Sequence, residues 1–359
     1  MLSKNTIKLK DIAVEISERI NDPSKSGYDI FVGLEHLDSG SLFVNRWGST
    51  KEVKSAMKLF KAGDILFARR NTYLKRASIA RFDGVCSGDI IVLRQNDILM
   101  KDFLILIMNL EKFWDFAISN SAGTMSKRAK WRDICEFEIE FLSKIEEKQI
   151  SDIIFLFEKS IEDKMILLED IARYKNKKVS NIINGEIYAD KKSDKKKLKE
   201  LVEIKYGDSP KNILDENGEY CVYGTGGITG RSNQYLYNQE SVIIGRKGTI
   251  DKPLYVDEPF WCIDTTFYIV PKVEVNIKWL YYAIKNIRLE KYNEATGVPS
   301  LNRSTLYNIE IEVPKIEVQN IIVQTIESIE MVENNINLNI NDTKDLRNKV
   351  LNEMIICKI

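Results

Sequence analysis

Short basic loops carry the side chains of this chain that are best suited to binding a phosphate or the edge of a base. Arginine, lysine, serine, threonine and asparagine supply most of the side-chain hydrogen bonds that proteins make to nucleic acids. In the first half of the chain the candidates are Arg69, Arg70, Lys75 and Arg76, then Ser126, Lys127 and Arg128. In the second half they are Gly227, Arg246, Lys247 and Thr249, then Ser300, Asn302 and Arg303. A single basic loop is usually a solvated turn, but basic loops at matching points of both halves favour contact with double-stranded DNA.

Residue types that enzymes need for catalysis are scarce or unpaired. His36 is the only histidine, which argues against a histidine-based triad and a zinc site. Residues 224–230 are rich in glycine, but no Gly-Lys-Ser/Thr follows and the spacing is not that of a dinucleotide loop. A flexible turn is the better interpretation of that segment. The carboxylates show no pairing that singles out an acid and a base, so we expect a non-catalytic chain with no metal and no cofactor of its own.

The elements that would position the basic loops occur twice along the chain. Residues 138–146 resemble residues 310–317, and residues 121–126 parallel residues 295–300. A repeat of this length exceeds a solenoid unit, so we interpret it as a duplicated domain followed by a helix. Two similar but non-identical copies suggest one task carried out at two places.

Each copy combines short strands with helices, which predicts an α+β domain. Apolar runs bounded by glycine indicate buried strands, and apolar residues that recur every three or four positions indicate helices. The expected strands are residues 64–68, 89–93, 241–244 and 266–270. The expected helices within the copies are residues 101–116 and 277–287.

A long amphipathic segment follows each globular copy. Ile150, Ile154 and Ile161 in the first segment, and Ile322 and Ile326 in the second, keep spacings typical of a helix that buries one stripe. Neither stripe can remain in water, so we expect the two helices, each about 50 Å long, to pack on each other. The lysine-rich residues that connect the copies, 191–199, are interpreted as a solvated linker.

The predicted fold is α+β, with two globular domains separated by two long antiparallel coiled-coil helices and an internal pseudo-two-fold repeat. At 359 residues the chain exceeds one comfortable core, in agreement with two domains. The expected divisions are a first globular domain at 1–142, a first long helix at 143–190, a second globular domain at 191–313 and a second long helix at 314–359.

Composition narrows the class of protein and its compartment. The formal net charge is zero, which argues against a nonspecific polyanion binder, although local patches can still contact phosphates. The five cysteines are scattered, as expected of free thiols in a reducing cytosol. Neither a signal peptide nor a membrane-length apolar run is found in the sequence. We therefore expect a soluble, cytoplasmic protein that makes no contact with a membrane.

Several motifs of the second copy together resemble the specificity subunits of type I restriction–modification systems. Their combination is specific, whereas each alone would be weak, and the first copy carries them only faintly. The motifs are residues 223–228, 241–250, 252–256, 259–265, 297–302 and 313–314. One departure is the start of each long helix, where the Pro-rich approach common in the family is replaced by residues 142–149 and 314–319.

The resemblance implies a division of labour along the chain. Each globular copy would be a target-recognition domain that reads half of a split, asymmetric DNA sequence through the basic loops named above. The paired helices would set the unread spacer and bind two methyltransferase subunits, with a nuclease–translocase subunit as a further partner. S-adenosylmethionine and ATP would be bound only by these partner subunits. The alternative is a duplicated coiled-coil adaptor that binds proteins rather than DNA, which explains the neutral charge equally well but not the basic loops.

Overall fold

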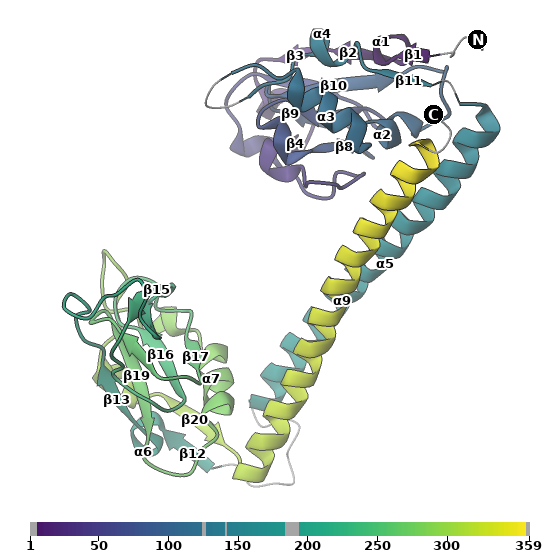
Figure 1. Cartoon of the computed structure of the whole chain (residues 1–359). Helices are drawn as coiled ribbons and strands as arrows, with labels where there is room; N and C mark the ends of the chain where they lie inside the picture. Colours follow the sequence, from purple (N-terminus) through teal and green to yellow (C-terminus); the bar gives the residue numbers. More distant parts are fainter. Residues whose placement is uncertain (1–5, 124–126, 141, 184–193, 357–359) are drawn as a thin grey trace. The chain divides into compact units, whose positions relative to one another are not determined.

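The computed structural model describes residues 6–123, 127–140, 142–183 and 194–356. The chain divides into two compact units (Figure 1). Unit 1 comprises Met1–Ile166 with Asn337–Ile359, and unit 2 comprises Leu167–Ile336. Each unit therefore contains one globular part and a segment of each long helix.

An antiparallel sheet of four strands, in the order β2-β10-β7-β8, forms the centre of unit 1. The strands β7 and β8 are buried along their whole length, whereas the edge strand β2 is largely exposed. The strands of this sheet are β2 (Ala13–Ile16), β7 (Ile65–Ala68), β8 (Ala77–Ile79) and β10 (Ile90–Gln95). A second sheet contains β3 (Arg19–Ile20), β4 (Ile30–Val32), β5 (Gly48–Ser49), β6 (Met57–Phe60) and β9 (Gly84–Cys86). The strands expected at 64–68 and 89–93 are confirmed.

Short helices pack on the central sheet of unit 1, and Trp114 stacks on Phe67 with ring centroids 5.5 Å apart. The single helix expected at 101–116 is wrong, because the chain forms two helices there. Asn109 ends the first by donating from its side-chain amide to the Ile105 carbonyl at 2.9 Å, and Leu110 is extended. The helices of this part are α1 (Leu9–Ile12), α2 (Phe103–Ile107), α3 (Glu111–Ser119) and α4 (Trp131–Ile134). The 3-10 turns are η1 (Pro23–Lys25), η2 (Leu34–His36), η3 (Thr50–Glu52) and η4 (Thr72–Leu74).

Unit 2 repeats this plan with a four-stranded antiparallel sheet in the order β13-β19-β16-β17. Its strands are β13 (Val202–Tyr206), β16 (Ser241–Gly245), β17 (Leu254–Val256) and β19 (Thr266–Pro271). A further sheet contains β14 (Tyr220–Gly224), β15 (Gly227–Ser232) and β18 (Phe260–Cys262). The helices are α6 (Leu198–Leu201), α7 (Ile277–Asn286), η5 (Leu289–Tyr292) and α8 (Arg303–Tyr307). The expected strands at 241–244 and 266–270 and the helix at 277–287 are confirmed.

A two-stranded ribbon joins the beginning and the end of each globular part. In unit 1, β1 (Thr6–Lys8) pairs with β11 (Glu138–Glu140), and in unit 2, β12 (Asp194–Lys197) pairs with β20 (Glu310–Val313). The solvated linker expected at 191–199 is therefore wrong from Asp194 onward, because backbone pairing with β20 orders the lysine-rich segment. Residues 191–193 lie outside the described residues.

Two long helices, α5 (Lys144–Ile183) and α9 (Ile316–Ile356), follow the globular parts. In unit 1 their segments run antiparallel, because Glu158 pairs with Arg347 while Lys164 donates to the Thr343 hydroxyl at 2.7 Å. The apolar stripes are buried as expected, with Ile150, Ile154, Leu351 and Ile355 in the core of unit 1. The core of unit 2 takes in Ile322 and Ile326. A coiled-coil geometry for the pair stays a prediction.

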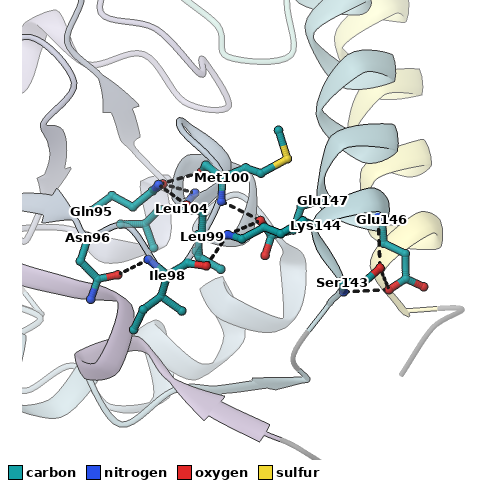
Figure 2. Close-up of polar contacts among 10 residues, drawn as sticks. All are labelled: Gln95, Asn96, Ile98, Leu99, Met100, Leu104, Ser143, Lys144, Glu146 and Glu147. Carbon is teal, nitrogen blue, oxygen red and sulfur yellow. Dashed lines mark hydrogen bonds and ion pairs between the residues drawn. The ribbon is translucent and has the colours of Figure 1, made fainter.

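The beginning of α5 is tied to the globular part of unit 1 (Figure 2). Ser143 and Glu146 form reciprocal backbone–side-chain bonds, the Ser143 amide donating to the Glu146 carboxylate at 2.9 Å. The buried Glu147 accepts a hydrogen bond from the Met100 amide at 2.6 Å and pairs with Lys144 at 3.2 Å. In unit 2, the side-chain oxygen of the buried Gln319 accepts a hydrogen bond from the Asn276 amide at 2.9 Å. Both long helices are thus fixed at their first turn.

Candidate nucleic-acid interface

Two loops of unit 2 are held together by their backbones. The Leu301 amide donates to the Arg246 carbonyl, and the Gly248 amide donates to the Pro299 carbonyl, both at 2.9 Å. The first loop follows β16, and the second leads into α8, whose first turn is capped by Asn302. As a result, five of the seven residues predicted in this half line one cavity of about 260 Å³: Arg246, Lys247, Ser300, Asn302 and Arg303.

Glycine is required at the last residue of β16 and once in the loop that follows it. A Cβ at Gly245 would lie 2.0 Å from the Thr249 carbonyl oxygen, and Gly248 has a φ of +96°. The predicted residue Thr249 is half-buried and does not line the cavity. Gly227 begins β15 beside a two-residue hairpin turn and does not line it either. The hydroxyl of Thr225 in that turn is 3.4 Å from the Cβ position of Gly248, so the hairpin touches the loop.

An aromatic ring that sequence reasoning missed completes the cavity. The guanidinium carbons of Arg246 and Arg303 lie 5.3 and 4.8 Å from the ring centroid of Tyr206. Arg246 also donates from Nη1 to the backbone carbonyl of Asp264 at 3.0 Å. Among the residues that the structure describes, none of the three cations Arg246, Lys247 and Arg303 forms an ion pair.

Unit 1 contains the same pair of loops, held by the same backbone bonds. The Ala129 amide donates to the Arg69 carbonyl at 2.9 Å, and the Asn71 amide donates to the Lys127 carbonyl at 3.0 Å. These bonds place Arg69 and Arg70 where unit 2 has Arg246 and Lys247. Asn71, with a φ of +54°, takes the place of Gly248, since asparagine tolerates this conformation better than most residues.

The cations of unit 1 are engaged by protein groups. Arg70 and Arg128 each lie 3.8 Å from one carboxylate oxygen of Asp89, and Lys75 pairs with Glu111. Arg76 donates to the Leu34 carbonyl at 2.7 Å, and burial lowers the pKa of its guanidinium.

Among the other predicted residues of unit 1, Arg69 is half-buried, and its Nε has no hydrogen-bond partner among the described residues. Lys127 is exposed, whereas Ser126 lies outside the described residues.

The described residues offer little for other kinds of site. No three histidine, cysteine, aspartate or glutamate side chains among them are arranged to hold a metal ion. Within the same part of the chain, every helix is too short or too polar to cross a membrane.

Residues 190–343 match the family model described as the type I restriction modification DNA specificity domain. The chain is 25% identical over 131 residues to the EcoDI specificity subunit of a type I restriction enzyme from Escherichia coli, covering 36% of this chain and 29% of that protein. It is 24% identical over 148 residues to the EcoprrI specificity subunit of the same organism, covering 40% and 37%. The matched region thus spans about a third of the length of these curated relatives.

Solved structures share the fold over nearly the whole chain. A chain from a type I R-M system, studied for its assembly and conformational transition, matches with a TM-score of 0.65 at 16% identity, covering 98% of this chain and 97% of that chain. The S subunit of a type I restriction–modification system from M. genitalium matches with a TM-score of 0.53 at 14% identity, covering 99% and 98%. The domain model and the curated relatives agree that residues 190–343 are similar to a type I restriction modification DNA specificity domain, and the chain shares its fold with solved chains of type I systems.

Proposed function

We propose that this chain is the non-catalytic, sequence-specific DNA-recognition subunit of a type I restriction–modification enzyme. The observation that carries the proposal is the cavity of unit 2, which gathers Arg246, Lys247 and Arg303 with Ser300 and Asn302. These side chains lie inside the segment that matches the DNA specificity domain. Cations without ion pairs beside hydroxyl and amide groups are suited to phosphates and base edges.

The two globular parts would recognise two halves of a split, asymmetric target. Equivalent loops in both units are held by the same backbone bonds, which supports a shared mode of presentation. The side chains on those loops differ, with Arg70 and Arg128 in one unit where the other has Lys247 and Ser300. Different side chains on one backbone would give different half-sites.

The long helices would bind two methyltransferase subunits and set the spacer between half-sites. Large apolar side chains exposed on both helices support a docking role, because such side chains are uncommon on a surface that stays in water. The most exposed are Ile145, Leu156, Met331 and Leu338. S-adenosylmethionine and ATP would bind to partner subunits, and a nuclease–translocase subunit would be a further partner. The buried, free thiols of Cys86, Cys135, Cys221 and Cys262 suit a cytoplasmic protein.

Mapping of methylated adenines in host DNA, with and without the gene, tests the proposal. We expect a split motif that is methylated only when the gene is present. Alanine at both Arg246 and Lys247 should abolish methylation of that motif while leaving the helical content by circular dichroism unchanged. A methylation pattern that does not depend on the gene, together with capture of protein partners, would instead support a duplicated adaptor.

A further inference from the structure

Tyr206 stands at the junction of the unit 2 sheet and the cavity. It ends β13, pairs with Phe267 of β19, and its ring lies 5.1 Å from the ring of Phe267. The sheet therefore fixes the ring, while 44% of the residue stays exposed. Arg246 and Arg303 reach this ring from the two loops that line the cavity.

Holding two arginines at one ring brings like charges together. Both guanidinium carbons lie close to the same ring centroid, at 5.3 Å for Arg246 and 4.8 Å for Arg303. Lys247 lines the same cavity and adds a third positive charge. The one carboxylate of the lining, Glu294, accepts a hydrogen bond from the Thr305 hydroxyl. Cation–π attraction acts within about 6 Å and offsets part of the repulsion. An anion between the arginines would offset the rest.

We infer that Tyr206 is a positioning residue that holds Arg246 and Arg303 for a backbone phosphate of DNA. The inference rests on the proposed function. The planar guanidinium matches two phosphate oxygens, and a guanidinium already held against a ring loses less side-chain entropy when it binds. The ring thus preorganises a contact that fixes the position of unit 2 on the duplex without depending on base sequence.

Among the described residues, this arrangement of one tyrosine ring and two arginines occurs in unit 2 and has no equivalent in unit 1. The α4 helix of unit 1 begins at Trp131, in the position where α8 begins at Arg303. The strand equivalent to β13 is β2, which pairs up to Ile16 and is followed by Ser17 in the place of Tyr206. Neither the ring nor its second arginine is therefore present at the equivalent place.

The test uses the full chain with its proposed methyltransferase partner and a mixed-sequence DNA duplex as the probe. Affinity is measured by fluorescence anisotropy over a series of salt concentrations. The double variant Arg246→Gln with Arg303→Gln should reduce the slope of log K against log salt by about one to two. Tyr206→Leu should weaken binding about three- to ten-fold, and Tyr206→Phe, which keeps the ring, should bind like the wild type.

Controls separate positioning from folding. Tyr235→Leu removes a tyrosine of unit 2 that is 46% exposed and does not line the cavity, and it should leave affinity unchanged. The double variant Arg246→Lys with Arg303→Lys keeps both charges but loses the planar groups. It should weaken binding several-fold with an unchanged slope, and it tests the inference even where Tyr206→Leu lowers thermal stability.

Four outcomes would overturn the inference. A stable Tyr206→Leu complex that matches the wild type in affinity and slope would refute this inference but not the proposed function. Wild-type affinity of the double lysine variant would have the same meaning. Loss of affinity with an unchanged slope in the double glutamine variant would mean that the arginines contact bases, not phosphates. A wild-type complex that binds no duplex at all would refute the proposed function and this inference with it.

Discussion

The paired basic loops of the two units are held by the same backbone bonds, but their cations are balanced differently. In unit 1, Arg70 and Arg128 share the carboxylate of Asp89. In unit 2, Arg246 and Arg303 share the ring of Tyr206. A carboxylate neutralises charge, whereas a ring holds a cation and leaves its charge available to a ligand. Because the loops are held by backbone bonds, their side chains can vary without loss of the frame.

The largest expected effect concerns how each unit secures the helix pair. Arg347, 1% exposed, pairs with the buried Glu158 in unit 1, whereas the pair of Lys175 with Glu333 in unit 2 is more accessible to water. Arg347→Met should destabilise the protein by about 3–5 kcal/mol, because a buried carboxylate loses its partner. Lys175→Met should cost about 1 kcal/mol or less. Chemical denaturation measures both, and equal losses would contradict the contrast.

A smaller loss of stability is expected at the first turn of each long helix, where unit 1 has the carboxylate of Glu147 and unit 2 has the amide of Gln319. Glu147 has Lys144 beside it, but the position equivalent to Lys144 in unit 2 is Ile316. Gln319→Glu would therefore bury a carboxyl group without a cation and should cost about 2–4 kcal/mol at neutral pH. Glu147→Gln should cost less than about 1 kcal/mol, since an amide oxygen can still accept from Met100.

The Gln319→Glu loss should depend on pH with a definite sign. Burial raises the pKa of the introduced carboxyl above its value in the unfolded chain. Its folded form then binds a proton that the unfolded chain releases, so the stability of the variant falls as pH rises. Denaturation curves of the variant and the wild type, taken from acidic to neutral pH, should diverge in that direction. Convergence toward neutral pH would contradict burial of this group.

The third prediction concerns the left-handed residue of each loop. Gly248→Ala should destabilise unit 2 by about 1–2 kcal/mol, because its φ of +96° strains any residue with a Cβ. Asn71→Gly in unit 1 should cost little, since its φ of +54° suits glycine. Thermal denaturation of the two variants provides the measurement. A Gly248→Ala variant as stable as the wild type would mean that the loop backbone can adjust to a side chain at this position.

The smallest effect concerns the salt dependence of DNA binding. Arg70→Gln with Arg128→Gln should reduce the salt slope less than Arg246→Gln with Arg303→Gln does. The reason is that Asp89 already balances part of the charge of the unit 1 arginines. The same duplex titration measures both pairs. Equal slopes would show that the ion pairs to Asp89, 3.8 Å long, do not persist in solution.

Local patterns predicted the elements well where periodicity determines them. The buried strands and the stripe of Ile150 and Ile154 follow from apolar spacing alone. The break at Asn109 was missed because its side chain ends a helix inside an otherwise regular pattern. The pairing of β12 was missed because its partner β20 lies more than a hundred residues away, and lysines favour a loop in any local reading.

The candidate site could be predicted from the sequence only where its residues carry a local signal. Arg246, Lys247 and Arg303 were recognisable as cations near glycine or serine, and the structure brings them together. Tyr206 carries no such signal, because its approach depends on the strand order β13-β19-β16. The partners of the unit 1 cations, such as Asp89, could not be predicted from the sequence either, because ion pairing depends on the tertiary fold.

The two ribbons at the base of the globular parts have a consequence for evolution. Lys8 pairs with Glu138 and Lys197 with Glu310, so the chain begins and leaves each globular part at adjacent points. A segment whose ends meet can be replaced without rethreading the remaining chain. Under the proposed function, genetic exchange between two such ribbon strands would transplant one candidate DNA-binding domain as a single unit, with the helices on either side left as they were.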